Sequence, residues 1–240
     1  TFSKVVKIAG QRKMLTRYLV VTGASITQFT IIGLLFSYGI FFKELELEFG
    51  WSRTMLSSCL AIAFLSMGIL AIIGGHLTNK YGPSLVLGIS GILFGLGFAL
   101  ISQISEPWHL FIIFGIFIGI GLSTHDVATL STIAHWFPKR RGFITAIVKI
   151  GTAFGQIMLP LIAAFLILKF DWRLSTIIIG LTAACLLFLS AFLVKLPKSL
   201  NLKDRTRPID GIFFNIASKS PTFKKLCAIQ FLYFPTLITI

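Results

Sequence analysis

Long apolar runs separated by short polar links make up most of this 240-residue chain. The runs are 21 to 30 residues long, and a helix needs about 20 apolar residues to cross the hydrocarbon core of a membrane. They lack the polar alternation of membrane β-strands. The pattern therefore predicts an all-α integral membrane protein with a bundle of six spanning helices. Because the links are short, we expect consecutive helices to be antiparallel neighbours. The six predicted spans are 18–42, 54–78, 83–104, 108–137, 143–168 and 174–194.

Composition supports a membrane protein and gives it an orientation. Only 12% of the residues are charged, against roughly 25% in soluble domains. The net charge of +14 would indicate a nucleic-acid partner in a soluble protein, but here the cations sort by side. Seventeen of the 22 lysines and arginines flank the spans on the side of the N-terminus, and four lie on the other side. This bias predicts a multi-pass protein of the cell membrane with a cytoplasmic N-terminus, without a nucleic-acid partner and in contact with the lipid bilayer.

The runs divide the chain into four predicted parts. A basic cytosolic N-terminus, 1–17, precedes the bundle at 18–194, and a basic, proline-containing cytosolic loop follows at 195–226. Within that loop, apolar residues at helical spacing predict a short amphipathic helix, with a disordered loop as the alternative. These residues are Ile209, Ile212, Phe213, Ile216 and Ala217. A seventh apolar run starts at 227 and the sequence stops within it at 240, so we expect a fragment of a longer protein.

Two formally charged residues interrupt the apolar runs, Asp126 and Lys149. At 1.5 Å per residue, Asp126 would lie roughly 15 Å, and Lys149 roughly 10 Å, from the inner ends of two neighbouring antiparallel helices. Charged side chains at such depth face the bundle interior and pair. The two therefore predict either a structural ion pair that joins the hairpin, or a substrate or proton site in a polar cavity.

Further polar residues lie inside the runs and complete the candidate substrate or proton path. His125 adjoins Asp126, and a histidine with its ordinary pKa is able to titrate near neutral pH, but neighbours on a helix point about 100° apart, so the two need not face one cavity. Gln28, Gln156 and Tyr38 must be satisfied by partner helices or by a water-filled path. For Gln28 and Gln156, contact between helices and cavity lining remain equal alternatives.

Small-residue motifs indicate close helix packing. Without a Cβ, glycines four residues apart let two helix backbones approach closely in lipid. We expect these seams to pack within the chain, with homodimer formation as the alternative. They are Gly91-x-x-x-Gly95, Gly115-x-x-x-Gly119 and Gly151-x-x-x-Gly155.

Three stretches carry a resemblance to a known family. The link from Gly75 to Gly82, Gly-His-Leu-Thr-Asn-Lys-Tyr-Gly, resembles the signature loop of the major facilitator superfamily, Gly-x-Leu-x-Asp-Arg/Lys-x-Gly. Asn79 replaces the usual Asp, so it keeps the capacity to accept hydrogen bonds and cap the next helix but not to form the charge pair. Residues 37–42 with 49–53, and the link 136–142 (Trp-Phe-Pro-Lys-Arg-Arg-Gly), are similar to the monocarboxylate and oxalate/formate branch of the superfamily.

The resemblance implies an architecture and roles for residues. Such transporters have twelve helices in two halves with the substrate path between them, so this chain would be the N-terminal half plus the start of helix 7. Spans one, four and five of that half border the path, which favours cavity roles for Gln28, Asp126 and Lys149. The resemblance also implies an inner gate loop formed by Gly75, Asn79, Lys80, Gly82, Arg140 and Arg141.

The function expected from these features is secondary active transport of a small organic solute by alternating access. The solute would be an organic anion such as a monocarboxylate, moved with or without a coupled proton, and the missing C-terminal half would be the partner. Alternatives are a neutral or cationic solute, or a seven-helix receptor or channel. The absence of His-Glu-x-x-His, Gly-x-Ser-x-Gly and paired aspartates argues against an intramembrane enzyme. We expect no cofactor and no metal, because the three cysteines have no ligand spacing.

Overall fold

The computed structural model describes residues 2–197, 219–225 and 227–229, with side chains from residue 14 onward. The chain divides into two compact units, Thr1–Lys198 and Ser199–Ile240. In the second unit, residues 221–225 and 227–229 are helical. The predicted amphipathic helix and residues 230–240 of the predicted seventh span lie outside the described residues.

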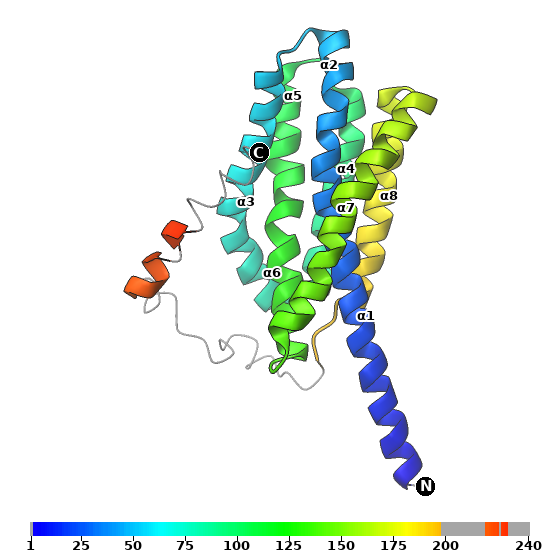
Figure 1. The fold of residues 1–240 in the computed structure, drawn as a ribbon, viewed down its shortest axis with the longest axis vertical. Helices are drawn as coiled ribbons and strands as arrows, with labels where there is room; N and C mark the ends of the chain where they lie inside the picture. The colour runs from blue at the N-terminus through cyan, green and yellow to red at the C-terminus, as the bar shows by residue number, and fades with distance from the viewer. Residues whose placement is uncertain (1, 198–218, 226, 230–240) are drawn as a thin grey trace. The chain divides into compact units, whose positions relative to one another are not determined.

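The first unit consists of helices joined by short links, and its described residues contain no strand (Figure 1). Among the described residues, six helical segments are long and apolar enough to cross a membrane, and each coincides with one of the predicted runs. The prediction of an all-α, six-span bundle is therefore confirmed. In chain order the elements are α1 (Phe2–Ser37), η1 (Tyr38–Phe41), α2 (Phe42–Phe49), α3 (Arg53–Tyr81), α4 (Pro83–Leu100), η2 (Ile101–Gln103), α5 (Pro107–Ile112), η3 (Ile113–Ile118), α6 (Gly119–Trp136), α7 (Arg141–Lys169) and α8 (Trp172–Leu193).

Glycine, serine and proline residues mark the ends of several helices. Gly50 ends α2 in the left-handed region at φ 67°, a conformation that costs glycine little. The Ser52 side chain then accepts a hydrogen bond from the Met55 amide and caps α3. Gly82, at φ 91°, ends α3, and Pro83 occupies the first turn of α4, where its missing N–H costs nothing. The turns thus hold successive helices antiparallel.

All three glycine seams pack within the chain. A methyl group on Gly151 or Gly155 of α7 would clash with backbone carbonyls of α1, at Ser25 and Phe29. A methyl group on Gly95 of α4 would likewise clash with α8, and one on Gly119 of α6 would clash with α3. The prediction of intramolecular packing is confirmed for these positions, and Figure 1 shows α1 (blue) and α7 (green) side by side.

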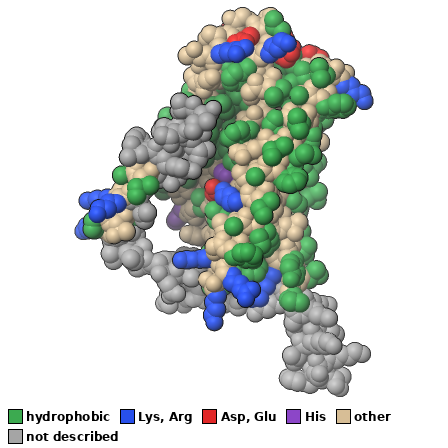
Figure 2. All heavy atoms as spheres, viewed as in Figure 1, with side chains coloured by type: hydrophobic (Ala, Val, Ile, Leu, Met, Phe, Trp, Pro, Cys, Tyr) green, Lys and Arg blue, Asp and Glu red, His purple; other side chains and the backbone are tan. Residues whose placement is uncertain are grey.

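The outward surface of the bundle is mainly apolar. Figure 2 shows hydrophobic side chains along the length of one face, with lysines and arginines gathered towards its two ends. α3 and α7 expose the most, because only 17% and 11% of an apolar 18-residue stretch in each is buried. Such a surface suits lipid or a packed helix rather than water.

Candidate functional site

The two charged residues of the apolar runs meet. Lys149 Nζ on α7 lies 2.7 Å from Asp126 Oδ1 on α6, a charge-assisted hydrogen bond at the short end of the usual range. The two side chains are 38% and 44% exposed respectively, so the pair opens to one side of the bundle. Figure 2 shows acidic, basic and histidine side chains together at mid-height of that face. The predicted meeting of the two residues is thus present in the structure.

Gln28 on α1 joins this pair to two threonines. Its amide nitrogen donates to Asp126 Oδ1 at 2.6 Å and to Thr129 Oγ1 at 3.4 Å. Its amide oxygen accepts from Lys149 Nζ at 3.2 Å and from Thr152 Oγ1 at 3.1 Å. Gln28 is fully buried, and the four contacts satisfy its amide group, which would otherwise be unpaired in an apolar bundle. We call Gln28, Asp126, Thr129, Lys149 and Thr152 the polar network.

Close backbone contact between α1 and α7 makes this network possible. Gly151 and Gly155 of α7 lie against the carbonyls of Ser25 and Phe29, so no side-chain layer separates the two helices. Lys149 and Thr152 are three residues apart and share one helix face. They therefore reach the same atom, the amide oxygen of Gln28.

His125 stands behind Asp126 rather than on the open side. It is buried, its Nδ1 lies 2.5 Å from the Leu122 carbonyl, and its Nε2 lies 3.6 Å from Asp126 Oδ1. A carbonyl only accepts, so Nδ1 carries the proton and Nε2 is the atom turned towards the carboxylate. His125 thus adjoins the pair without lining its open face.

The network leaves part of its capacity free. Within the described residues, every hydrogen bond to the Asp126 carboxylate goes to Oδ1, and none goes to Oδ2. The ammonium of Lys149 donates to Gln28 and Asp126. One of its three N–H donors therefore has no partner among the described residues. A half-exposed pair with one free donor and one free acceptor is able to bind a small polar group.

The structure does not bring Gln156 and Tyr38 into the network. Gln156 is half-buried, and its side chain makes no hydrogen bond within the described part of the chain. Tyr38 is fully buried in the core. Its ring centroid lies 4.3 Å from that of Phe114, in the π-helical turn η3, and its hydroxyl donates to the Leu56 carbonyl at 3.5 Å. The roles predicted for these two residues remain predictions.

The predicted inner gate loop is split between two links at one end of the bundle. Gly82 supplies the turn between α3 and α4. The suggestion that Asn79 caps the next helix is wrong, since Gly82 occupies the N-cap and no side chain caps α4. The Lys80 ammonium lies 5.2 Å from the centre of the Tyr81 ring. Arg140 and Arg141, beside the other link, are exposed, as are Asn79 and Lys80, whereas Gly75 is half-buried.

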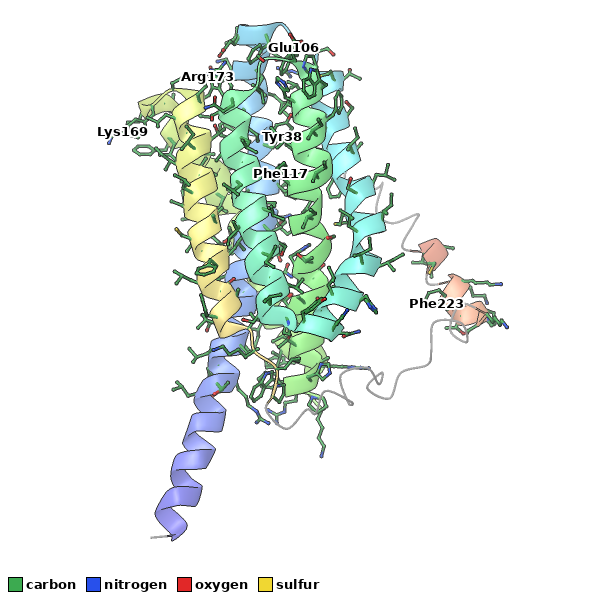
Figure 3. The ribbon with its side chains drawn as sticks, turned by 180° about the vertical axis from the view of Figure 1, so that it is seen from behind. Tyr38, Glu106, Phe117, Lys169, Arg173 and Phe223 are labelled. Carbon is green, nitrogen blue, oxygen red and sulfur yellow. The ribbon has the colours of Figure 1, made fainter. Side chains whose placement is uncertain are left out.

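Sequence reasoning missed the two threonines of the network and a second cluster at the opposite end. Arg173 donates to Glu48 Oε1 and to the Ser102 carbonyl, both at 2.5 Å, while the Trp172 indole donates to Glu48 Oε2 at 2.6 Å. We call Glu48, Ser102, Trp172 and Arg173 the outer clamp. It joins the ends of α2, η2 and α8 beyond the apolar core, and Figure 3 shows Arg173 at that end, with Tyr38 between the helices below.

Helical spans with a charged network at mid-depth define the class: a multi-pass helical membrane protein with an intramembrane polar site. The chain belongs to the major facilitator superfamily, because the family model for the Major Facilitator Superfamily matches residues 23–240. The resemblance inferred from the three motifs is confirmed.

Similar curated proteins are named as transporters. The chain is 26% identical to monocarboxylate transporter 7 of Homo sapiens over 161 residues, which is 67% of this chain and 31% of that protein. It is 27% identical to the uncharacterized MFS-type transporter YhjX of Escherichia coli (strain K12) over 180 residues, 75% of this chain and 44% of that protein. It is 24% identical to the MFS-type transporter opdF of Penicillium oxalicum over 221 residues, 90% and 51%. The chain thus spans about a third to a half of these relatives.

Proposed function

We propose that the full-length protein is a secondary active transporter of a small organic anion, such as a monocarboxylate, and that Lys149 binds its carboxylate. The observation that carries the proposal is the half-exposed ion pair of Lys149 and Asp126, 2.7 Å apart, in an otherwise apolar bundle. A charge kept at this depth costs at least about 2.5 kcal/mol. A function that needs the charge explains its presence.

The network supports distinct roles for its members. Lys149 has a spare donor for a carboxylate oxygen, and Gln28 holds the ammonium in place through its amide oxygen. Asp126 balances the lysine, so the empty site is neutral overall. Because a bound anion would add an uncompensated negative charge, a proton taken up by Asp126 would keep the site neutral during the crossing.

The relatives support the wider setting of the proposal. Several carry the name monocarboxylate transporter, and all of those described above are named as transporters rather than enzymes. Alternating access by rocking of two six-helix halves would supply the movement. The distribution of the cations supports a cytoplasmic N-terminus, and we place the protein in the cell membrane.

The experiment is radiolabelled monocarboxylate uptake by the full-length protein in cells, with surface abundance measured in parallel. Lys149→Met should reduce uptake to background while the protein still reaches the membrane. Lys169→Met is the matched control, because Lys169 is an exposed lysine in the last turn of the same helix. Uptake of normal affinity in Lys149→Met would refute the assignment.

A second variant separates the transport role from a purely structural ion pair. Asp126→Asn combined with Lys149→Met removes both charges and leaves neither unpaired. If the pair only joins α6 to α7, this double variant should transport normally. The proposal expects a folded protein without uptake.

A further inference from the structure

A ridge on the bundle surface separates two apolar grooves near the turn between α3 and α4. Tyr81, Leu85 and Ile89 form the ridge, and each side chain is more than half exposed. All three line both a groove of about 310 Å³ and a groove of about 380 Å³. The grooves therefore run side by side along one helix.

The two grooves have different walls and similar chemistry. Leu77 of α3 and Ile120 of α6 bound the first, where the hydroxyls of Ser90 and Thr124 are already paired at 2.7 Å. Phe188 and Phe192 of α8 bound the second, with Gly88 of α4 in its lining. Neither groove offers an unpaired charge, so each suits a hydrocarbon chain rather than a solute.

Both grooves run from the end of the bundle through most or all of the depth of one membrane leaflet. Both begin at the end of α3; the second reaches Ile92, about 14 Å along α4 from Pro83, and the first reaches Ser90, about 10 Å along the same helix at 1.5 Å per residue. Half of the hydrocarbon core is about 15 Å thick. An acyl chain anchored at the membrane surface would thus fill either groove.

Charge at the mouth of the grooves favours an anionic occupant. Lys80 is exposed beside the ridge, with its ammonium 5.2 Å from the centre of the Tyr81 ring. The cations Lys139, Arg140 and Arg141 belong to the other link at this end, and the described acidic residues lie at mid-depth or at the opposite end. Tyrosine and lysine are typical of the headgroup level of a bilayer.

We propose that the twin grooves bind one anionic phospholipid. Its two acyl chains lie on either side of the ridge of Tyr81, Leu85 and Ile89, and its phosphate pairs with Lys80. Because the ridge separates the grooves, a single acyl chain fills only one of them, and a lipid with two chains is needed to fill both. This site uses no residue of the polar network, so it does not depend on the proposed transport function.

Native mass spectrometry of the purified full-length protein tests the site, with dioleoyl phosphatidylglycerol and dioleoyl phosphatidylcholine as probes. One phosphatidylglycerol should stay bound per protein, preferred over phosphatidylcholine by a factor of about five, the effect of one surface lysine on an anionic lipid. Lys80→Gln should abolish the preference. Lys169→Gln is the matched control, because Lys169 also lies beside an aromatic ring at a helix end, 5.8 Å from the centre of Phe170. Equal binding of both lipids, or equal effects of both variants, would overturn the proposal.

A second variant tests the two-chain geometry. A Cβ on Gly88 would meet only the Ala191 methyl, at 3.6 Å, so Gly88→Ala adds a methyl group to the lining of the second groove without a steric clash. It should weaken binding of phosphatidylglycerol and leave binding of single-chain lysophosphatidylglycerol unchanged. Unchanged binding of both lipids, or loss of both, would contradict the arrangement of the chains.

Discussion

Replacing Gln28 with leucine removes the centre of the polar network without changing the length of the side chain greatly. Four hydrogen bonds are lost, to Asp126, Thr129, Lys149 and Thr152. Side-chain hydrogen bonds between membrane helices contribute about 0.6 kcal/mol each. We therefore expect Gln28→Leu to lower the free energy of unfolding by about 2.4 kcal/mol, with the two charge-assisted bonds, to Asp126 and from Lys149, raising that figure.

The assay is unfolding of the purified full-length protein by sodium dodecyl sulfate in mixed micelles, followed by circular dichroism. Gln156→Leu is the matched control, since Gln156 is a half-buried glutamine of α7 whose side chain makes no hydrogen bond within the described residues. Its free energy of unfolding should change by less than about 0.5 kcal/mol. If Gln28→Leu and Gln156→Leu unfold alike, the four contacts do not stabilise the bundle and the reasoning fails.

Three further outcomes are expected. Gly155→Ala should destabilise the fold by about 1–3 kcal/mol through the clash with α1, whereas Gly142→Ala, at a glycine with open space around it, should be tolerated in the same unfolding titration. Arg173→Lys keeps the charge but lacks the planar guanidinium group that reaches two acceptors. It should therefore lower the free energy of unfolding by up to about 1 kcal/mol at low salt. A larger loss at high salt would contradict an electrostatic role. In a cysteine-free background, an impermeant maleimide should label Ser105→Cys on intact cells and Lys139→Cys only after permeabilisation; the reverse pattern would overturn the orientation.

The spans were predictable because one strong physical constraint governs them. The helical segments coincide with the runs to within a few residues at most ends, since an apolar run of membrane length has no other stable conformation in lipid. The first span was the exception. α1 begins at Phe2, and the helical segment continues through η1 and α2 to Phe49. It extends into polar sequence at both ends because no helix-ending residue precedes Gly50.

The pairing of Asp126 with Lys149 was predictable from depth and from the cost of charge in lipid. The rest of the network was not. Thr129 and Thr152 look like the many other threonines of membrane helices, and only their contacts with Gln28 distinguish them. The spacing of Lys149 and Thr152 on one helix face was the available signal.

The outer clamp was unpredictable for a different reason. Glu48 and Arg173 lie far apart in the sequence, and exposed charges at helix ends are too common to be paired by inspection. Their contact depends on the three-dimensional arrangement of α2 and α8, which sequence patterns do not provide.

The glycine seam between α1 and α7 also sets which parts of the site are able to separate. Backbone lies directly on backbone there, so sliding one helix along the other would drive larger side chains into the gap. Gln28, Lys149 and Thr152 therefore travel as one body, while Asp126 and Thr129 belong to α6. A transition that opens the network would therefore separate α6 from α1 and α7. The hydrogen bonds that would break are those accepted by Asp126 and Thr129.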